Sequence, residues 1–236
     1  LNTVSELKAG DKVYFNNRGK SLFLFVLGKE DLAKGLIILG AHVDSPRLDI
    51  KQQPLYEDSG LVLLDTHYYG GIKKYQWVAQ PLALHGVVCK KDGSLVKVVI
   101  GESEDDPVVG VSDLLIHLAA DQMKKTGSNV VEGEDLNVLF GSIPATTEED
   151  EKELVKKNIL NLLKEKYDIE EDDFISAEIE VVPAGKARDY GFDRSMVMAY
   201  GQDDNVCAYT SLRAIVEEEN PERTSCCILS DKEEVG

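Results

Sequence analysis

Positive charge is scarce in this sequence, and so are cysteines and long apolar runs. The 26 lysines and arginines stand against 43 aspartates and glutamates, which gives a formal net charge of −17 at pH 7. A surface this acidic repels nucleic acids and anionic membranes, and no run rich in Lys or Arg offers a local exception. No stretch approaches the roughly 18 apolar residues of a membrane-spanning helix. The composition therefore predicts neither a nucleic-acid partner nor a membrane partner.

The four cysteines form neither a paired framework nor a Cys-x-x-Cys motif. Cys89 and Cys207 stand alone, whereas Cys226 and Cys227 are adjacent in an apolar run that continues to Leu229. Burial as small apolar side chains explains the adjacent pair better than metal binding does. Reduced thiols are typical of the cytoplasm, so we expect a cytoplasmic protein.

The order of the apolar runs predicts one α/β domain interrupted by another domain. A chain of 236 residues is long enough for one large or two smaller domains. Residues 11–46 have the pattern of a hairpin followed by a buried strand. Further on, short apolar runs alternate with turn signals such as Asp92-Gly93, which favours an antiparallel barrel or sandwich. We predict an α/β domain formed by residues 1–47 and 189–236, and an inserted, mostly β domain with helices formed by residues 48–188.

Three segments carry the capping and spacing signals of helices. They are residues 112–124, capped by Ser112; residues 147–167, capped by Thr147 and apolar at helical spacing; and residues 204–218, after a predicted strand at 196–200.

A histidine and an aspartate follow the first predicted buried strand. The run from Leu36 to Leu39 predicts a strand buried on both faces, and Gly40 ends it. His42 and Asp44 then leave the carboxyl end of this strand, where open α/β sheets place ligands and catalytic groups. Residues i and i+2 of an extended chain point to the same side. Asp44 is therefore placed to hold one ring nitrogen of His42 while the other meets a metal.

Two acidic pairs complete the set of candidate ligands. Asp203-Asp204 stands at the start of a predicted helix, where the dipole stabilises carboxylates beside a dication. Glu233-Glu234 follows the apolar run 226–229 and could divide the work of metal ligand and general base. Each motif alone has a plainer explanation: a hydrogen-bonded His–Asp pair, a helix cap, or a solvated acidic face. Their joint occurrence favours a two-metal hydrolytic centre.

Longer motifs around these residues carry a resemblance to a known family. They are His42-Val43-Asp44-Ser45-Pro46, the run from Gly201 to Leu212, and Asp231-Lys232-Glu233-Glu234-Val235-Gly236, with Tyr69-Gly70-Gly71 and Phe192-Asp193-Arg194-Ser195. Over nearly its whole length the chain resembles the aspartyl aminopeptidase family of dinuclear zinc exopeptidases. The resemblance implies a zinc-exopeptidase-like α/β/α catalytic domain, incomplete here, and an inserted domain that serves oligomerisation and substrate capping. It also implies removal of an N-terminal residue, in many members an acidic one, from a peptide.

The resemblance assigns roles to five residues near these motifs. His42 resembles a terminal ligand of one zinc, Asp203 the carboxylate that bridges two, and Glu234 a terminal ligand of the other. Glu233 resembles the general base. Asp44 resembles the residue that orients the histidine. Two zinc ions per subunit are implied, with cobalt or manganese as alternatives.

His117 and the assembly are also interpreted through the resemblance. His117 resembles a histidine of the inserted domain that reaches the active site of a neighbouring subunit. From the sequence alone, a histidine in the apolar run 114–118 is more often a packing residue. Peptide substrates and a large homo-oligomer, a dodecamer, follow from the same family resemblance.

The sequence departs from the family pattern in two places. One histidine and two carboxylates do not fill two coordination spheres, because each zinc takes about four ligands. The family supplies a further Asp and a further His after the Glu-Glu pair. The chain therefore resembles a partial copy without the C-terminal part, and we expect it to bind metal poorly and to be inactive as it stands. Ala79 and Gln80 occupy positions where many relatives carry Asp-Arg, which leaves the substrate side chain open.

Two other interpretations remain open at this point. One is a non-catalytic assembly module built around the inserted domain. The other is a metal-dependent deacylase or carboxypeptidase, which needs a pocket for a free carboxylate, usually built around arginine. The arginines available for such a pocket are Arg47, Arg188, Arg194 and Arg213.

Overall fold

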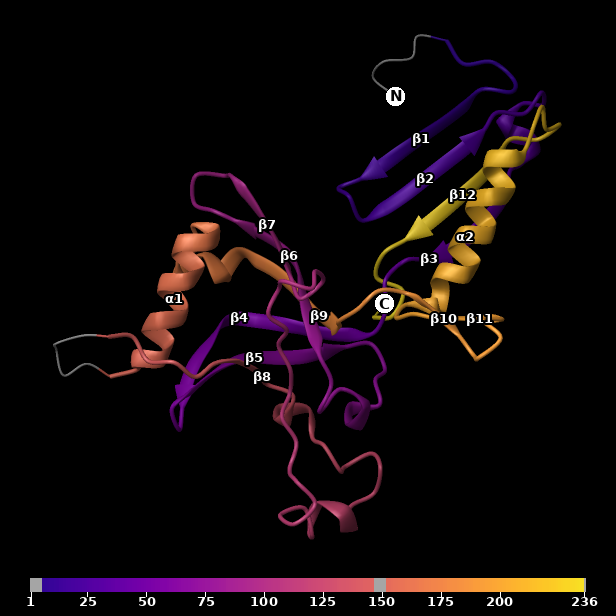
Figure 1. Cartoon of the computed structure of the whole chain (residues 1–236). Coiled ribbons are helices and arrows are strands. Elements are labelled where there is room, and N and C mark those ends of the chain that lie inside the picture. The colour runs from indigo at the N-terminus through magenta and orange to yellow at the C-terminus, as the bar shows by residue number, and fades with distance from the viewer. Residues whose placement is uncertain (1–5, 147–151, 236) are drawn as a thin grey trace. The chain divides into compact units, whose positions relative to one another are not determined.

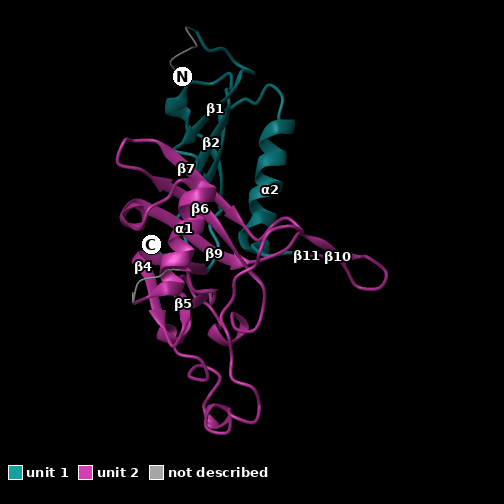
Figure 2. Cartoon of the chain, turned by 60° about the vertical axis from the view of Figure 1, so that its left-hand side comes forward, with its two compact units in different colours: residues 1–46, 199–236 teal, residues 47–198 magenta. Residues whose placement is uncertain are grey.

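The computed structural model describes residues 6–146 and 152–235, and the chain divides into two compact units (Figures 1 and 2). Unit 1 comprises Leu1–Pro46 and Ala199–Gly236, and unit 2 comprises Arg47–Met198. The second unit is thus inserted into the first. Its carboxyl boundary lies ten residues beyond the predicted one, since residues 189–198 belong to unit 2. The assignment of catalytic and assembly roles to the two units stays a prediction.

Unit 1 is built on a four-stranded mixed sheet covered by one long helix. The strand order is β1-β2-β12-β3; β1 and β2 form the predicted hairpin, β12 runs antiparallel to β2, and β12 runs parallel to β3. Helix α2 packs on β3, β12 and β2, and buries Ala208 and Ile215 against Val26, Cys227 and Leu229. The elements are β1 Lys12–Asn17, β2 Ser21–Val26, β3 Ile37–His42, α2 Gln202–Glu217 and β12 Ser225–Ser230, with a short 3-10 turn at Leu32–Lys34.

The prediction that the first buried strand is covered on both faces is wrong. Within the described residues β3 is the last strand of its sheet, and Ile37 and Ile38 are 51% and 58% exposed. Only Leu39, Ala41 and the following Val43 pack against the core beneath α2. An apolar run of this length does not distinguish a central strand from an edge strand, because the distinction depends on which neighbours pair with it.

Unit 2 is dominated by a six-stranded antiparallel sheet in the order β7-β6-β9-β4-β5-β8. In β5 alternate side chains, Val62, Leu64 and Thr66, are buried, as expected for a strand with one covered face. Helix α1 packs on the sheet, and its buried residues Val155 and Ile159 join the main core. The elements are β4 Arg47–Asp58, β5 Leu61–Tyr69, β6 Leu82–Cys89, β7 Leu95–Ile100, β8 Val138–Gly141, α1 Leu154–Tyr167, β9 Ala177–Pro183, β10 Arg188–Tyr190 and β11 Met196–Met198, with 3-10 turns at Lys74–Gln76, Gln122–Lys124, Gly133–Asp135 and Glu171–Ser176.

The barrel or sandwich expected from the sequence is found as a curled sheet with short bridges. Val109 exchanges two backbone hydrogen bonds with Leu82 of β6, and Gly110 accepts one from Leu139 of β8. The segment 109–111 thereby connects two strands that are not neighbours in the sheet. The predicted Asp92-Gly93 turn joins β6 to β7, and Gly93 has the positive φ of 84° that such a turn requires.

The predicted helix at 112–124 is absent from the described structure. Only a 3-10 turn at Gln122–Lys124 is present, and the apolar side chains at 114, 115, 116 and 118 are exposed. The Asp113 carboxylate accepts hydrogen bonds from the next backbone N–H and from the Gln122 side chain. A helix gains most of its stability from packing an apolar face, and of the apolar side chains between 114 and 119 only Ala119 is buried among the described residues.

The other two predicted helices are present. Helix α1 begins at Leu154, and the predicted cap Thr147 lies outside the described residues. Helix α2 ends one residue before its predicted limit. The predicted strand at 196–200 is shorter, since β11 pairs only with β10 in a small exposed ribbon of unit 2. Over the described part of the chain, no helix has both the length and the apolar character to cross a membrane.

The core of unit 2 yields a first testable prediction. Leu48 is fully buried in β4 opposite Val181, so Leu48→Ala should lower the free energy of unfolding by about 2–5 kcal/mol. Leu162→Ala removes an exposed side chain of α1 and should change it by less than about 0.5 kcal/mol. Urea denaturation measures both variants. Equal effects would contradict the placement of Leu48 in the core.

Candidate metal centre

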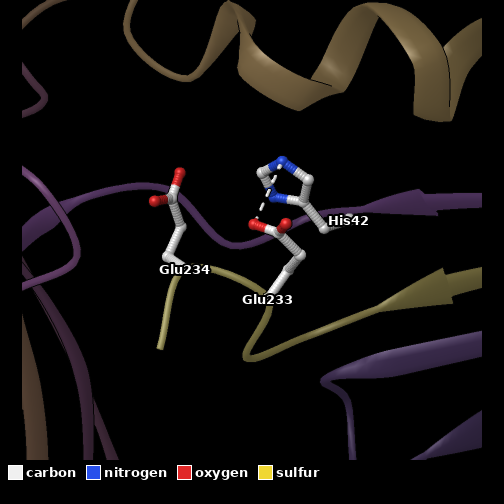
Figure 3. A group of neighbouring side chains, drawn as sticks. All are labelled: His42, Glu233 and Glu234. Atoms are coloured by element: carbon white, nitrogen blue, oxygen red, sulfur yellow. Dashed lines mark ion pairs between the residues drawn. The ribbon is translucent and has the colours of Figure 1, made fainter. Parts of the chain in front are cut away.

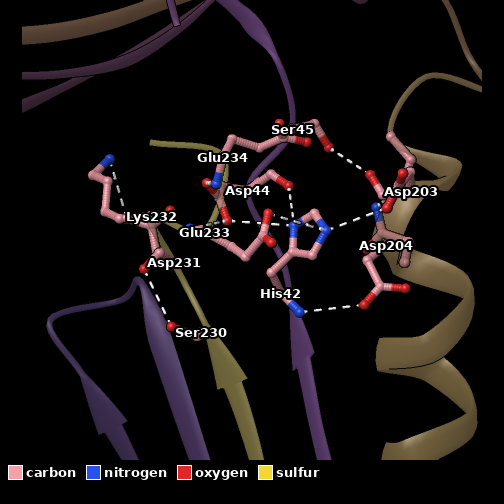
Figure 4. A network of polar contacts seen from close by, with 12 residues as sticks. His42, Asp44, Ser45, Asp203, Asp204, Ser230, Asp231, Lys232, Glu233 and Glu234 are labelled. Carbon is pink, nitrogen blue, oxygen red and sulfur yellow. Dashed lines mark hydrogen bonds and ion pairs between the residues drawn. The ribbon is translucent and has the colours of Figure 1, made fainter. Parts of the chain in front are cut away.

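The parallel pairing of β3 with β12 brings two distant motifs to one edge of the sheet. Ser230 at the end of β12 lies opposite His42 at the end of β3, and Val43 N–H donates to the Ser230 carbonyl over 2.9 Å. Parallel strands end at the same edge, so the chain reaches Asp44 and the Glu233-Glu234 pair at neighbouring points. Figure 4 shows both segments beside the start of α2. Two strand ends and one helix start therefore meet at this edge.

Hydrogen bonding selects the ring nitrogen through which His42 can bind a metal. Nδ1 lies 2.9 Å from the backbone oxygen of Asp44, and a carbonyl oxygen only accepts. The proton of the neutral ring therefore sits on Nδ1, which leaves the Nε2 lone pair for a ligand. Nε2 faces Asp203 Oδ1 at 3.2 Å and Glu233 Oε2 at 3.8 Å.

His42, Glu233 and Glu234 form a compact group of donor atoms (Figure 3). One ligand atom from each lies within 4.8 Å of the other two. Burial raises the pKa of Glu234 above its usual value, and the carboxylates of Glu233, Asp44 and Asp203 raise it further against the opposing effect of His42. Mutual repulsion among clustered carboxylates is the condition that a bound cation relieves.

Asp203 and Asp204 occupy the start of α2, where the backbone is not yet helical. Their φ and ψ angles are −87° and 114°, and −114° and 30°, and the peptide bond between them is cis. The Asp203 side chain is 89% exposed and points its Oδ1 at His42. Asp204 accepts from the His42 backbone N–H at 3.4 Å. The Cys207 thiol, together with that N–H, holds the pKa of Asp204 below its usual value.

Asp44 does more in the structure than the sequence indicated. Its carboxylate lies 3.5 Å from His42 Nδ1 but accepts two shorter hydrogen bonds of 3.1 Å, from the backbone N–H groups of Glu233 and Glu234. Asp44 is 4% exposed, so the carboxylate is buried and satisfied by the loop that it holds. Its position thus fixes the Glu-Glu segment as well as the histidine. The spacing of His42 and Asp44 in the sequence predicts the contact of Asp44 with the histidine. It gives no indication of the contact with the Glu233-Glu234 segment.

The surrounding carboxylates also influence the protonation of His42. Burial lowers its pKa, but the Asp44 carbonyl, the Asp203 hydrogen bond and the charges of Glu233 and Asp44 outweigh burial and place it above the usual value. Without a cation the site therefore holds a proton more tightly than a solvated histidine does. A metal that binds Nε2 has to displace that proton.

The remaining predicted residues lie in unit 2 or are engaged elsewhere. His117 is in an exposed turn of unit 2, and its predicted role stays a prediction. Arg47 is buried, donates to Asp49 at 2.7 Å, pairs with Glu180 at 3.3 Å and stacks on Tyr69. Arg47 is therefore committed to a structural network, which argues against its use in a carboxylate pocket. Arg194 and Arg213 are each paired with a neighbouring acid, Asp189 and Glu217.

The donor set fits zinc in chemical terms. One imidazole nitrogen and several carboxylate oxygens are ligands that zinc accepts, and Asp203 Oδ1 lies beside the compact group. The Glu233 carboxylate is exposed, whereas the Asp44 carboxylate that positions the loop is buried. This combination leaves the donor atoms accessible from solvent. The described residues thus offer a group of donor atoms that could hold a zinc ion.

A histidine and several carboxylates gathered at the carboxyl edge of an α/β sheet define the chain as a candidate metallohydrolase. A family model described as Aminopeptidase I zinc metalloprotease (M18) matches residues 1–236, and the chain belongs to this family. The resemblance inferred from the motifs is thereby confirmed. The mixed α/β fold is confirmed as well by the structures described next.

The relatives agree with the family over nearly the whole chain. A probable M18 family aminopeptidase 1 from Clostridium acetobutylicum is 66% identical over 230 residues, which cover 98% of this chain and 49% of that relative. A crystal structure of the M18 aminopeptidase from Thermotoga maritima matches with a TM-score of 0.93 at 47% identity, covering 100% of this chain and 51% of that one. The mApe1 dodecamer of S. cerevisiae, with a TM-score of 0.68 at 21% identity and coverage of 96% and 50%, shares the fold. The chain spans about half the length of the curated relatives it matches.

Proposed function

We propose that the complete protein is a zinc-dependent aminopeptidase that removes N-terminal residues from peptides. The single observation that supports this most is the convergence of His42, Glu233 and Glu234 within 4.8 Å, with Asp203 Oδ1 3.2 Å from the same imidazole. The family of the chain is described as a zinc metalloprotease, which supports zinc as the metal. Two zinc ions per subunit, with cobalt or manganese as substitutes, are part of the proposal.

The side chains take distinct roles in this proposal. Zinc, when bound, polarises a peptide carbonyl and lowers the pKa of a water molecule. His42 Nε2 and Glu234 act as terminal ligands, and Asp203 acts as the bridging carboxylate. Glu233 Oε2, at 3.8 Å from His42 Nε2, takes a proton from the attacking water and passes it to the leaving amine. Asp44 acts through His42 and through the Glu233-Glu234 backbone, so it is a positioning residue.

The curated relatives are about twice as long as this chain, and we propose that residues corresponding to their other half complete the coordination spheres. Three protein ligands are fewer than two zinc ions need, since each takes about four including water. The 236-residue chain by itself is accordingly expected to bind metal weakly and to turn over no substrate. This expectation is tested together with the metal below.

Assembly and substrate choice are the finer parts of the proposal. The exposed apolar side chains of Leu114, Leu115, Ile116 and Leu118 form a surface that a second copy of the chain could cover, in line with the dodecamer formed by S. cerevisiae mApe1. His117 lies among them and would act across such an interface, bracing the oxyanion. A preference for acidic N-terminal residues and a cytoplasmic location complete the proposal.

Metal removal tests the proposed function directly. The protein expressed from its complete reading frame should lose peptide hydrolysis on prolonged chelation and regain it with zinc, and it should also respond to cobalt or manganese. Aminoacyl chromogenic substrates with Glu, Asp and Leu residues measure both turnover and side-chain preference. The 236-residue chain serves as the comparison, because it has only the three proposed ligands His42, Asp203 and Glu234. Chelation that leaves hydrolysis unchanged would refute the proposal.

A further inference from the structure

We propose that Ser45 and Tyr200 are positioning residues that hold the Asp203-Asp204 turn in register with His42. The inference rests on the proposed function only in that Asp203 is taken as a metal ligand. Neither side chain was assigned a role as ligand or base, although Ser45 lies in the motif that contains His42 and Asp44. Both come from segments that flank the site, and both donate to backbone carbonyls of the opposite segment.

Apart from the backbone contacts of Ser45 and Tyr200, the turn meets β3 through two side-chain contacts with His42, one from Asp203 at 3.2 Å and one from Asp204 at 3.4 Å. The Asp203 side chain is almost fully exposed, and neither Asp203 nor Asp204 has helical backbone angles, so the regular hydrogen bonds of α2 do not define their position. The turn is closed from within by Asn205, whose side-chain amide donates to the Gly201 carbonyl over 2.6 Å. That bond shapes the turn. It does not place the turn relative to β3.

Ser45 supplies the first connection between the two segments. Its hydroxyl donates to the Asp203 carbonyl over 3.2 Å, and the residue is only 9% exposed. Gly201 leaves room for this contact, because a Cβ at that position would lie 3.2 Å from Ser45 Oγ and 3.1 Å from Asn205 Nδ2. Gly201 also has a φ of 78°, which glycine adopts without strain. The serine hydroxyl therefore sits under the turn that carries the exposed carboxylate.

Tyr200 supplies a second connection in the opposite direction. Its Oη donates to the Pro46 carbonyl over 2.7 Å. One hydrogen bond fixes a distance but permits rotation, whereas two bonds at different points also fix orientation. The proline ring restricts φ at position 46, so the accepting carbonyl belongs to a backbone with little freedom of its own. The two hydroxyls thus define where the start of α2 lies beside the end of β3.

Within the described residues, the tripeptide Asp44-Ser45-Pro46 consequently contacts all three segments that carry the proposed ligands. Asp44 holds the His42 ring through its carbonyl and the Glu233-Glu234 backbone through its carboxylate. Ser45 and Pro46 hold the segment that carries Asp203. Loss of the Ser45 hydroxyl leaves the Asp44 contacts in place. The expected defect is therefore selective: the bridging ligand shifts while the histidine and the two glutamates stay together.

Ser45→Ala and Tyr200→Phe test this inference in the complete protein. Each should weaken the binding of both zinc equivalents by about 10–100-fold, because both share the Asp203 carboxylate in the proposed site, and the double variant should weaken it further. Competition with a chromogenic chelator measures the two dissociation constants. In protein loaded with two cobalt ions, electron paramagnetic resonance should show reduced magnetic coupling, because coupling requires the shared carboxylate.

Thr210→Val is the matched control. Thr210 lies on the same helix, and its hydroxyl donates only to carbonyls of its own helix, those of Val206 and Cys207. This control should have the zinc dissociation constants of the wild-type protein and the same magnetic coupling between two bound cobalt ions. The metal-free Tyr200→Phe protein should unfold at the same temperature as the control, which separates positioning from general stability.

The outcomes are distinguishable. Wild-type protein that binds no zinc would overturn the proposed function itself. Wild-type affinity and coupling in both Ser45→Ala and Tyr200→Phe would overturn the positioning role and leave the proposed function standing. Weakened zinc binding together with a lowered unfolding temperature of the metal-free Tyr200→Phe protein would show a general structural role and also overturn the inference.

Discussion

Glu233→Gln should reduce kcat of the complete protein by at least about 100-fold while zinc content stays at the wild-type level. The amide has nearly the shape of the carboxylate but cannot accept the proton of the attacking water. The backbone N–H of residue 233 keeps its hydrogen bond to Asp44, so the loop that carries Glu234 should not move. His42 and Glu234 therefore retain their positions as terminal ligands.

Steady-state kinetics and zinc analysis on the same preparation measure the two quantities. Glu222→Gln is the control, since Glu222 is also an exposed glutamate of unit 1. Its carboxylate forms an ion pair with Lys29 and contacts none of the proposed ligands among the described residues. It should leave kcat unchanged. A parallel loss of zinc and turnover in Glu233→Gln would mean that Glu233 is a ligand and that the base lies elsewhere.

Asp44→Asn should damage both metal binding and folding. The buried carboxylate accepts two backbone N–H groups, and the substitution turns one of its oxygens into an NH₂ group that faces a donor. A buried donor left without an acceptor lowers the free energy of unfolding by about 1–3 kcal/mol. The Glu-Glu loop loses its support, whereas His42 keeps the Asp44 carbonyl and loses only the charge 3.5 Å from Nδ1. Zinc affinity should therefore fall by about 10–100-fold.

Urea denaturation of the metal-free protein and a chelator competition assay separate the two effects. Asp11→Asn provides the comparison, because Asp11 also accepts a backbone N–H, from Lys8, but in an exposed turn of the same unit. Its effect on unfolding should be small, since water replaces an exposed acceptor. An Asp44→Asn protein with wild-type stability and reduced kcat alone would restrict the role of Asp44 to the histidine.

The chemistry of the site was more predictable from the sequence than its geometry. His42, Asp203 and Glu234 are recognisable because each stands in a motif at the end of an apolar run or the start of a helix. Their meeting depends on the parallel register in which Ser230 lies opposite His42, and no local pattern encodes that register. The hydrogen bonds that Asp44 accepts from the Glu233-Glu234 backbone, and the one that Ser45 donates to Asp203, join residues more than 150 positions apart. A sequence pattern within one segment cannot report them.

The errors in the fold have a common physical origin. The run from Leu36 to Leu39 is apolar enough for a central strand, and the run 112–124 has a helix cap and helix-forming residues. In both cases tertiary neighbours decide the outcome: β3 pairs on one side only within the described residues, and the side chains of Leu115 and Ile116 are exposed. Intrinsic propensity is a weak guide wherever packing is the larger contribution.

The strand order of unit 1 constrains when the protein can fold. Strands β2 and β3 are made early, but β12, which lies between them, begins only at Ser225. During synthesis the first hairpin and β3 therefore remain without β12 until unit 2 has been synthesised. Unit 2 can fold separately in that time. Closing so long a loop is slow, since contacts distant in sequence form late. His42 and Asp44 reach Glu233 and Glu234 only after this step, so the nascent chain carries no assembled centre until its sheet is completed.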